Sequence, residues 1–137
     1  MPHFGQTSRA RLEQLDIRLA AVLERVIPFI DFTVLETHRS KEKQNKYYKE
    51  GRSKLAYPGS KHNSNPSKAV DVAQYYKKAP HVRWTKEAAV DFAFLAGTII
   101  GVGRAMGVPI RWGGDWNRNG KTLDEVFHDL PHLEIDE

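Results

Sequence analysis

The chain has 137 residues, of which 40% are hydrophobic and 28% are charged, and it contains no cysteine. This length predicts a single domain over residues 1–137, and the composition is typical of a globular protein rather than a disordered or fibrous one. Without cysteine, disulfides, thiol nucleophiles, cysteine-ligated zinc and iron–sulfur clusters are all excluded. Any bound metal must therefore be held by histidines and carboxylates.

The net charge of +4 is concentrated in the middle of the chain. Residues 38–68 carry nine basic and two acidic side chains, whereas residues 1–37 and 69–137 each carry a slight excess of acidic ones. Such a segment predicts an anionic partner, and a solvated surface without any ligand explains the charge equally well.

No segment of the sequence has the pattern of a targeting or membrane-spanning element. Arginines interrupt the apolar positions of the first 30 residues, so the apolar core of a signal peptide is missing. The longest apolar run, residues 92–100, is shorter than the roughly 20 residues that span a bilayer. We therefore expect a cytoplasmic chain without stable membrane association.

Hydrophobic periodicity predicts three elements in the first 51 residues. Leucines and valines recur at helical spacing over residues 12–26, which predicts one amphipathic helix that stops at Pro28. Residues 32–36 are short and β-branched, as in a strand. Ser40 is a favourable N-cap for a polar helix that ends at Gly51.

The rest of the chain predicts strands arranged around one long helix. Residues 52–68 are rich in Ser, Asn, Pro and Lys and predict a loop, and residues 69–73 alternate like a strand. An apolar helix from a Thr85 cap to Gly107 is expected to be the buried central helix. This order of elements predicts an α+β fold with a mostly antiparallel sheet and flanking helices. Two more strands are expected, at residues 108–112 and 132–135.

Three side chains with metal-binding chemistry lie in or beside the expected strands. His62 lies in the basic loop, Asp71 is in the middle of a strand and His132 begins the last strand. A carboxylate on an apolar strand costs stability unless it is paired or metal-bound. In zinc hydrolases without cysteine ligands, two histidines and one carboxylate commonly bind the metal, and water occupies the fourth position. Taken alone, each of these residues is more often structural.

Three neighbours of His132 are candidates for a role in the same site. Asp129 precedes it by three residues, and a tight turn would place this carboxylate where a general base acts. His128 is at helical spacing from His132, but Pro131 opposes a helix here, so we interpret His128 as peripheral. Glu134 shares a strand face with His132 and is expected to support the site rather than bind the metal.

A second cation site is a hypothesis for the loop that begins at Asp115. Asp115, Asn117 and Asn119, followed by Gly120, match the first half of a calcium-binding loop. Val126 occupies the twelfth position, where such loops carry a bidentate glutamate. Ordinary turn chemistry of Asn, Asp and Gly is the alternative interpretation.

The order of these motifs resembles that of the VanY/VanX-type D-alanyl-D-alanine metallopeptidases. The shared pattern is Ser60-Lys61-His62, then Ala69-Val70-Asp71, then Asp129-Leu130-Pro131-His132. The chain is most similar to the small phage endolysins that cut the L-alanyl-D-glutamate bond of peptidoglycan. The chain shares with them its length, the glycine-rich stretch from Trp112 to Trp116 and the His-Leu-Glu-Ile sequence near its end. Eight residues separate the first histidine from the aspartate, where the family usually has six.

This resemblance implies a Hedgehog/D-Ala-D-Ala-peptidase-like fold and a zinc-dependent peptidoglycan hydrolase. It assigns His62, Asp71 and His132 to Zn²⁺ binding and Asp129 to general base catalysis. A regulatory Ca²⁺ is a further hypothesis, carried by the loop at Asp115.

The resemblance also extends to the segment around Arg39 and Ser40, with Gln44. It implies that the Arg39 guanidinium points at the carbonyl oxygen or the developing oxyanion of the substrate. Ser60 and Gln44 are expected to bind substrate or to support the ligands. The other candidates for the first histidine ligand are weaker: His3, His38 and His81.

As an endolysin, the chain is expected to be a monomer that binds peptidoglycan and not nucleic acid. It would wait in the host bacterial cytoplasm until holin-type release lets it reach the periplasmic cell wall. A D,D-carboxypeptidase or dipeptidase on the same scaffold is the nearest alternative. Two others are a basic nucleic-acid-binding module over residues 41–68 and an inactive, zinc-retaining Hedgehog-type domain, which Asp129 disfavours.

Overall fold

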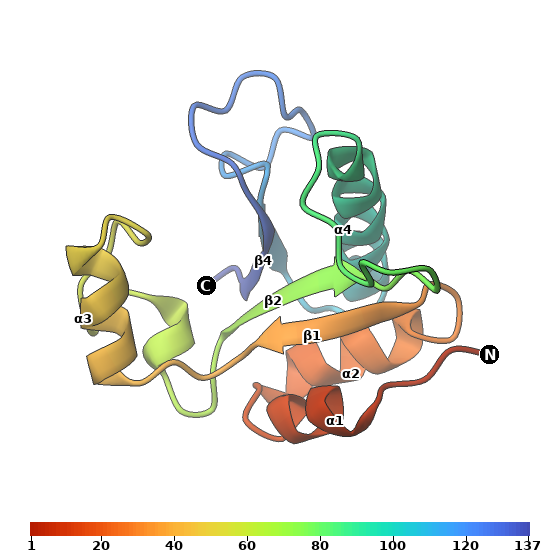
Figure 1. The fold of residues 1–137 in the computed structure, drawn as a ribbon, viewed down its shortest axis with the longest axis horizontal. Helices are drawn as coiled ribbons and strands as arrows, with labels where there is room; N and C mark the ends of the chain where they lie inside the picture. Colours follow the sequence, from red (N-terminus) through yellow and green to blue (C-terminus); the bar gives the residue numbers. More distant parts are fainter.

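In the computed structural model, which describes residues 1–137, four strands form one sheet in the order β1-β2-β4-β3 (Figure 1). Every neighbouring pair is antiparallel, which confirms the predicted α+β class. The last strand begins at Asp129, three residues earlier than predicted. The strands are β1 (Phe32–Glu36), β2 (Ala69–Gln74), β3 (Ile110–Gly113) and β4 (Asp129–Ile135).

The two faces of the sheet have different chemistry because successive side chains point to opposite sides of a strand. Val70 and Val72 of β2 and Leu133 of β4 are buried in the main hydrophobic core. Asp71 alternates with these valines and is paired in register with His132 of β4. One face of the central strands therefore builds the core, while the other carries the polar cluster.

The single helix predicted over residues 12–26 is shorter in the structure: residue 12 ends one helix, and residues 17–26 form a second. Helix α1 (Gln6–Leu12) ends and α2 (Ile17–Val26) begins after a turn. Asp16 caps α2 by accepting a hydrogen bond from the Arg18 backbone N–H at 2.9 Å. The apolar spacing continues across the break because both helices pack into the same core, so periodicity alone did not reveal the turn.

Helix α4 (Ala88–Ala105) covers the core face of the sheet. The sequence predicted a buried central helix, but only one side of α4 is buried. Phe92, Leu95 and Ile99 are buried, whereas Val90 and Phe94 are 73% and 63% exposed. The helix begins three residues after Thr85, whose hydroxyl accepts only a long 3.4 Å bond from the Ala88 N–H. Its apolar residues thus include a solvent-facing set.

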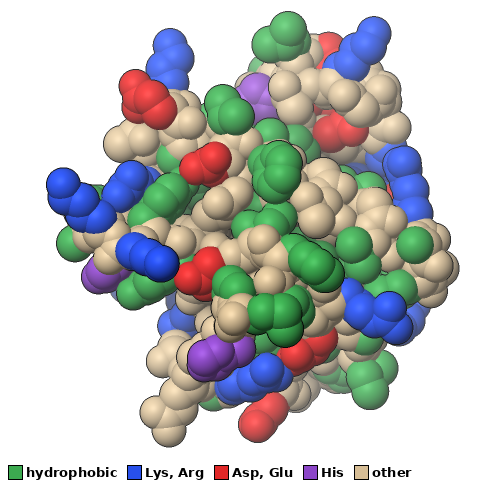
Figure 2. All heavy atoms as spheres, turned by 90° about the vertical axis from the view of Figure 1, so that its right-hand side faces the viewer, with side chains coloured by type: hydrophobic (Ala, Val, Ile, Leu, Met, Phe, Trp, Pro, Cys, Tyr) green, Lys and Arg blue, Asp and Glu red, His purple; other side chains and the backbone are tan.

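The length of α4 also corrects the prediction that no segment is long enough to cross a membrane. Residues 88–105 meet that criterion by length and composition, which a core helix of a soluble protein also does. One third of these residues are buried, where α4 packs against α2 and three strands. Figure 2 views the molecule from the α4 side and shows apolar side chains at its centre, with basic side chains toward the margins.

A polar helix and a short 3₁₀ turn lie away from the core helices, on the other side of the sheet in Figure 1. Helix α3 (Lys41–Lys49) begins after Ser40, whose hydroxyl accepts the Lys43 N–H at 3.1 Å, as predicted. Gly51, with φ of +76°, follows its end. The predicted loop contains the 3₁₀ turn η1 (Lys61–Asn63).

Replacing glycine by alanine is expected to change the free energy of unfolding in opposite directions at two positions of α4. A Cβ on Gly103 would lie 2.7 Å from Ile110 Cδ1 and 2.8 Å from the Val108 carbonyl oxygen, whereas one on Gly101 meets nothing within 4 Å. We expect Gly103→Ala to lower the free energy of unfolding by about 1–3 kcal/mol through overpacking. Gly101→Ala should raise it by about 0.5–1 kcal/mol because alanine favours the helix. Urea denaturation of both variants measures this; equal shifts would contradict the packing of α4 on β3.

Candidate active site

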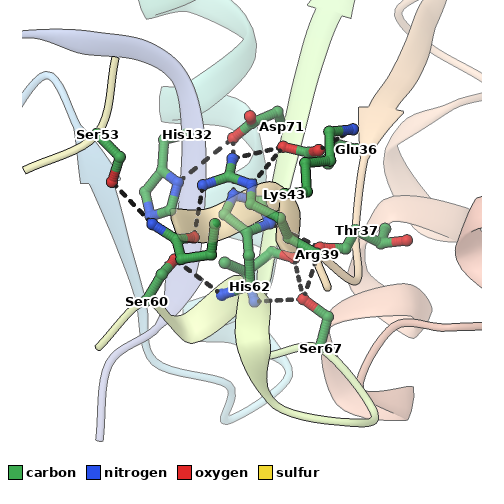
Figure 3. Close-up of polar contacts among 12 residues, drawn as sticks. Glu36, Thr37, Arg39, Lys43, Ser53, Ser60, His62, Ser67, Asp71 and His132 are labelled. Atoms are coloured by element: carbon green, nitrogen blue, oxygen red, sulfur yellow. Dashed lines mark hydrogen bonds and ion pairs between the residues drawn. The ribbon is translucent and has the colours of Figure 1, made fainter. Parts of the chain in front are cut away.

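Three side chains converge on the polar face of the sheet. His62 comes from η1, Asp71 from β2 and His132 from β4, and one donor atom of each lies within 4.8 Å of the others. His62 Nε2 and His132 Nδ1 lie 3.2 and 3.3 Å from the same Asp71 oxygen, Oδ1. Figure 3 shows the three side chains pointing toward one another. The eight-residue spacing between His62 and Asp71 therefore does not prevent their convergence.

The remaining nitrogen of each histidine is held by an acceptor outside the cluster. His62 Nδ1 donates to the Thr37 carbonyl at 2.7 Å, and His132 Nε2 donates to Glu134 at 2.8 Å. Metal-binding histidines are oriented in this way, because the outer bond fixes the tautomer. In the neutral ring, His62 Nε2 then presents a lone pair to the Asp71 carboxylate.

This arrangement fits a small divalent metal ion. A lone pair facing a carboxylate at 3.2 Å is repulsive unless a proton or cation lies between the two atoms. Zinc bonds of about 2.0–2.1 Å in a tetrahedral site place neighbouring donors about 3.3 Å apart, close to the distances observed. Two imidazoles and one carboxylate are also the donor set of catalytic zinc.

The charges in the cluster strongly perturb its pKa values. Burial opposes ionisation of Asp71, yet hydrogen bonds from His132 and His62 hold the pKa of this carboxyl well below its usual range. Burial also disfavours the His132 imidazolium, but hydrogen bonds to Asp71 and Glu134 raise its pKa to about 9. Despite burial, the hydrogen bond from His132 lowers the pKa of Glu134 to about 2. The cluster thus favours a positive charge between anionic oxygens.

Asp129 lies beside this cluster, at the first residue of β4. Burial and then the nearby negative charge of Asp71 raise the pKa of its carboxyl. A Cβ at Gly113 would lie only 2.2 Å from the Asp129 carbonyl oxygen, so the close approach of β3 to β4 requires glycine. This gives a physical reason for the glycine that follows Trp112 in the sequence motif.

Arg39 is buried and its guanidinium is fixed from two sides. Its Nε donates to Glu36 at 3.0 Å, its Nη2 also contacts Glu36, and its Nη1 donates to Gln44 at 2.9 Å. Gln44 is fully buried and also donates to Ser53 Oγ and the Leu55 carbonyl, at 2.9 and 2.6 Å. Gln44 thus positions Arg39 and the following loop.

Ser60 supports the first histidine through the backbone. It caps η1, and its hydroxyl accepts the His62 N–H at 3.2 Å while the Asn63 side chain accepts the Ser60 N–H at 3.1 Å. The four other histidines lie outside the cluster: His3, His38, His81 and His128. The peripheral interpretation of His128 agrees with its exposed position and its bond to the Thr122 carbonyl.

Sequence reasoning missed several residues that hold the site together. The sequence indicates only that Glu36 ends a strand, whereas in the structure it binds Arg39 and also Lys43, at 2.7 Å. Glu134 is buried between Arg111 and Lys61, at 2.8 and 3.3 Å. The β4 alternation placed Glu134 beside His132, but nothing in the sequence marked its cationic partners, which come from other segments.

The loop at Asp115 is folded by its own side chains. Asp115 accepts the Asn119 and Gly120 N–H groups at 3.1 and 2.8 Å. Asp124 accepts the side-chain amide of Asn117 at 3.2 Å and also contacts that of Asn119. The three residues of the calcium hypothesis and Asp124 therefore lie around one turn.

The candidate metal ligands, Asp129 and Arg39 all line one cleft of about 500 Å³. Residues 1–135 match the model of a family described as phage L-alanyl-D-glutamate peptidase. The chain belongs to this family. It is 28% identical to the L-alanyl-D-glutamate peptidase of Escherichia phage T5 in an alignment 138 positions long that covers 96% of each chain. The match confirms the resemblance drawn from the sequence motifs.

A solved structure has a similar fold. The crystal structure of Serratia marcescens L-Ala D-Glu endopeptidase ChiX matches with a TM-score of 0.72 and 22% sequence identity. The match covers 98% of this family member and 91% of the ChiX chain. The fold expected from the motifs is therefore confirmed along nearly the whole length.

The hydrogen bonds of Gln44 predict a large cost for its removal. We expect Gln44→Leu to lower the free energy of unfolding by about 2–4 kcal/mol, because buried donors and acceptors on Arg39, Asn63 and Leu55 lose their partner. Gln6→Leu, at an exposed position in α1, is the matched control and should change it by less than about 0.5 kcal/mol. Similar values for both variants in urea denaturation would argue against Gln44 as the support of Arg39.

Proposed function

We propose that the chain hydrolyses the L-alanyl-D-glutamate bond of the peptidoglycan stem peptide, with Zn²⁺ held by His62, Asp71 and His132. The observation that carries this proposal is the convergence of those donors beside Asp129, in the cleft of a member of this peptidase family. Zinc, when bound, would supply Lewis acidity and lower the pKa of a water molecule toward about 7.

Asp129 is the proton carrier in this proposal. Its pKa is raised by burial and by the charge of Asp71, so its carboxylate accepts a proton more readily than an ordinary aspartate. It takes the proton of the attacking water and returns it to the nitrogen of the leaving D-glutamate. The close contact of Gly113 with the Asp129 backbone fixes the start of β4, which carries this carboxylate.

Arg39 is proposed to bind the carbonyl oxygen that gains negative charge. A guanidinium has five N–H donors, of which Glu36 and Gln44 engage three. The remaining two are available to the substrate, in a group already fixed by its partners. Such preorganised donors stabilise an oxyanion because they need no rearrangement during the reaction. Ser60 and Gln44 act by positioning His62 and Arg39.

The proposed site of action is the cell wall, reached from the host cytoplasm after holin-type release, with the chain acting as a monomer. Part of the basic charge of residues 38–68 is used inside the cleft, because Arg39 and Lys43 pair with Glu36, and Lys61 with Glu134. This internal pairing favours a structural and catalytic use of the charge over a nucleic-acid-binding surface.

Digestion of purified peptidoglycan tests the bond and the roles together. The wild type should release fragments with new C-terminal L-Ala and N-terminal D-Glu ends, identified by mass spectrometry. Asp129→Asn should keep one zinc per chain, by elemental analysis, but lose about 10²–10⁴-fold in rate because the proton carrier is gone. His132→Ala should lose both zinc and activity.

Two outcomes would contradict this proposal. Release of terminal D-Ala alone would identify a D,D-carboxypeptidase on the same scaffold. Undiminished lysis by Asp129→Asn would exclude Asp129 as the proton carrier. His128→Ala is the control for histidine removal, because this exposed side chain lies outside the cluster; it should retain zinc and activity.

We also propose that the loop of Asp115, Asn117 and Asn119 binds a regulatory Ca²⁺, with Asp124 in place of the missing glutamate. This is supported by the oxygen-rich turn that these four side chains form. Calcium at about 100 times its Kd should stabilise zinc-replete protein by about 2.7 kcal/mol, seen as a higher melting temperature than in EGTA. Asp115→Ala should abolish the shift. An unchanged melting temperature and activity in the wild type would rule out the site.

A further inference from the structure

The cations that line the active-site cleft are unevenly paired. Glu36 forms ion pairs with both Arg39 and Lys43, and Glu134 forms ion pairs with both Lys61 and Arg111. The two remaining cations of the cleft lie on the loop after α3. Arg52 has only a distant partner, Glu50 at 3.7 Å, which is not part of the cleft lining. Lys54 forms no ion pair. The fold thus leaves two cations of the cleft largely uncompensated.

The loop that carries these two cations is anchored rather than free. The Arg52 and Ser53 N–H groups donate to the Tyr47 carbonyl at 2.8 and 3.1 Å. Ser53, which lies between Arg52 and Lys54 in the sequence, also accepts a hydrogen bond from the buried Gln44 side-chain amide. Figure 3 shows Ser53 at the edge of the polar cluster. The loop is therefore tied to the same glutamine that positions Arg39.

Aromatic rings hold both cationic groups in place without neutralising them. The Arg52 guanidinium lies over the Tyr47 ring, at 4.1 Å from its centroid, and the Lys54 ammonium lies 4.3 Å from the centroid of Phe127. Phe127 also lines the cleft, and its carbonyl accepts the Trp116 indole N–H at 3.0 Å. A cation on an aromatic ring keeps its charge and its capacity to bind an anion.

The proposed substrate carries a matching anion. A D-glutamyl residue has two carboxyl groups, and only one of them can continue the peptide. The other remains a free carboxylate on the same residue as the scissile nitrogen, close to the reaction centre. Binding this group needs a cation that lines the cleft and is not already paired within the protein.

We infer that Arg52 and Lys54 form a carboxylate-binding rim that selects the free carboxylate of the leaving glutamyl residue. The inference rests on the proposed function, since it names the part of that substrate which these cations bind. Arg39 is already assigned to the carbonyl oxygen of the scissile bond, and Lys43 is held at 2.7 Å by Glu36. The rim therefore determines specificity and lies apart from the proposed chemistry of Asp129.

Two synthetic stem peptides test the rim, one with the free glutamyl carboxylate and one with that group as a carboxamide. We expect the wild type to favour the acid by about 5-fold in kcat/KM, the upper range for an exposed ion pair. The difference should reside in KM, because the contact is present before and during the reaction. The double variant Arg52→Gln/Lys54→Gln should lose the preference, with its kcat/KM for the acid falling to that for the carboxamide.

The carboxamide peptide reports folding and chemistry independently of the rim. Lys54→Arg should retain the preference, and Lys86→Gln, at an exposed lysine outside the cleft, controls for the general loss of positive charge. A wild type without preference, or a double variant that keeps it, would overturn the rim. A wild type that cleaves neither peptide would instead overturn the proposed function, and the rim would fall with it.

Discussion

The structure depends on a carboxylate placed on the central strand of a small sheet. Asp71 lies between Val70 and Val72, whose side chains enter the core, so its own side chain must leave on the opposite face. A charge there is tolerated only with close partners, and His62 and His132 provide them at 3.2 and 3.3 Å. The surrounding elements place those two imidazoles at one oxygen.

Each histidine is in turn held by an anionic or carbonyl oxygen, and each anion by a cation. His132 is bound by Glu134, which is compensated by Arg111 and Lys61. The result is a polar layer in which charges alternate from the candidate metal position outward. This layer lies on the face of the sheet opposite the main hydrophobic core. The stable helices α1, α2 and α4 therefore support a site that they do not enter.

The sequence allowed prediction of the parts that depend on local pattern. The alternation around Asp71, the Ser40 cap and the histidine motifs predicted the strand, the helix start and the cluster. The break near Asp16 was missed because two helices that share one core keep the same periodicity. The roles of Glu36 and Gln44 were not predictable in full, because their partners approach only through tertiary contacts.

The uneven distribution of charge gains a physical meaning from the same contacts. From the sequence alone, an anionic partner and a solvated surface explain the nine basic residues of the middle segment equally well. In the structure, Glu36 and Glu134 form ion pairs with three of those side chains inside the cleft, whereas the anchored loop carries Arg52 and Lys54 without close carboxylate partners. The fold thus places part of this positive charge in ion pairs beside the candidate metal ligands and leaves two cations of the cleft without a close carboxylate. An anionic ligand is therefore expected to bind at Arg52 and Lys54, the cations of the cleft that have no close carboxylate partner within the protein.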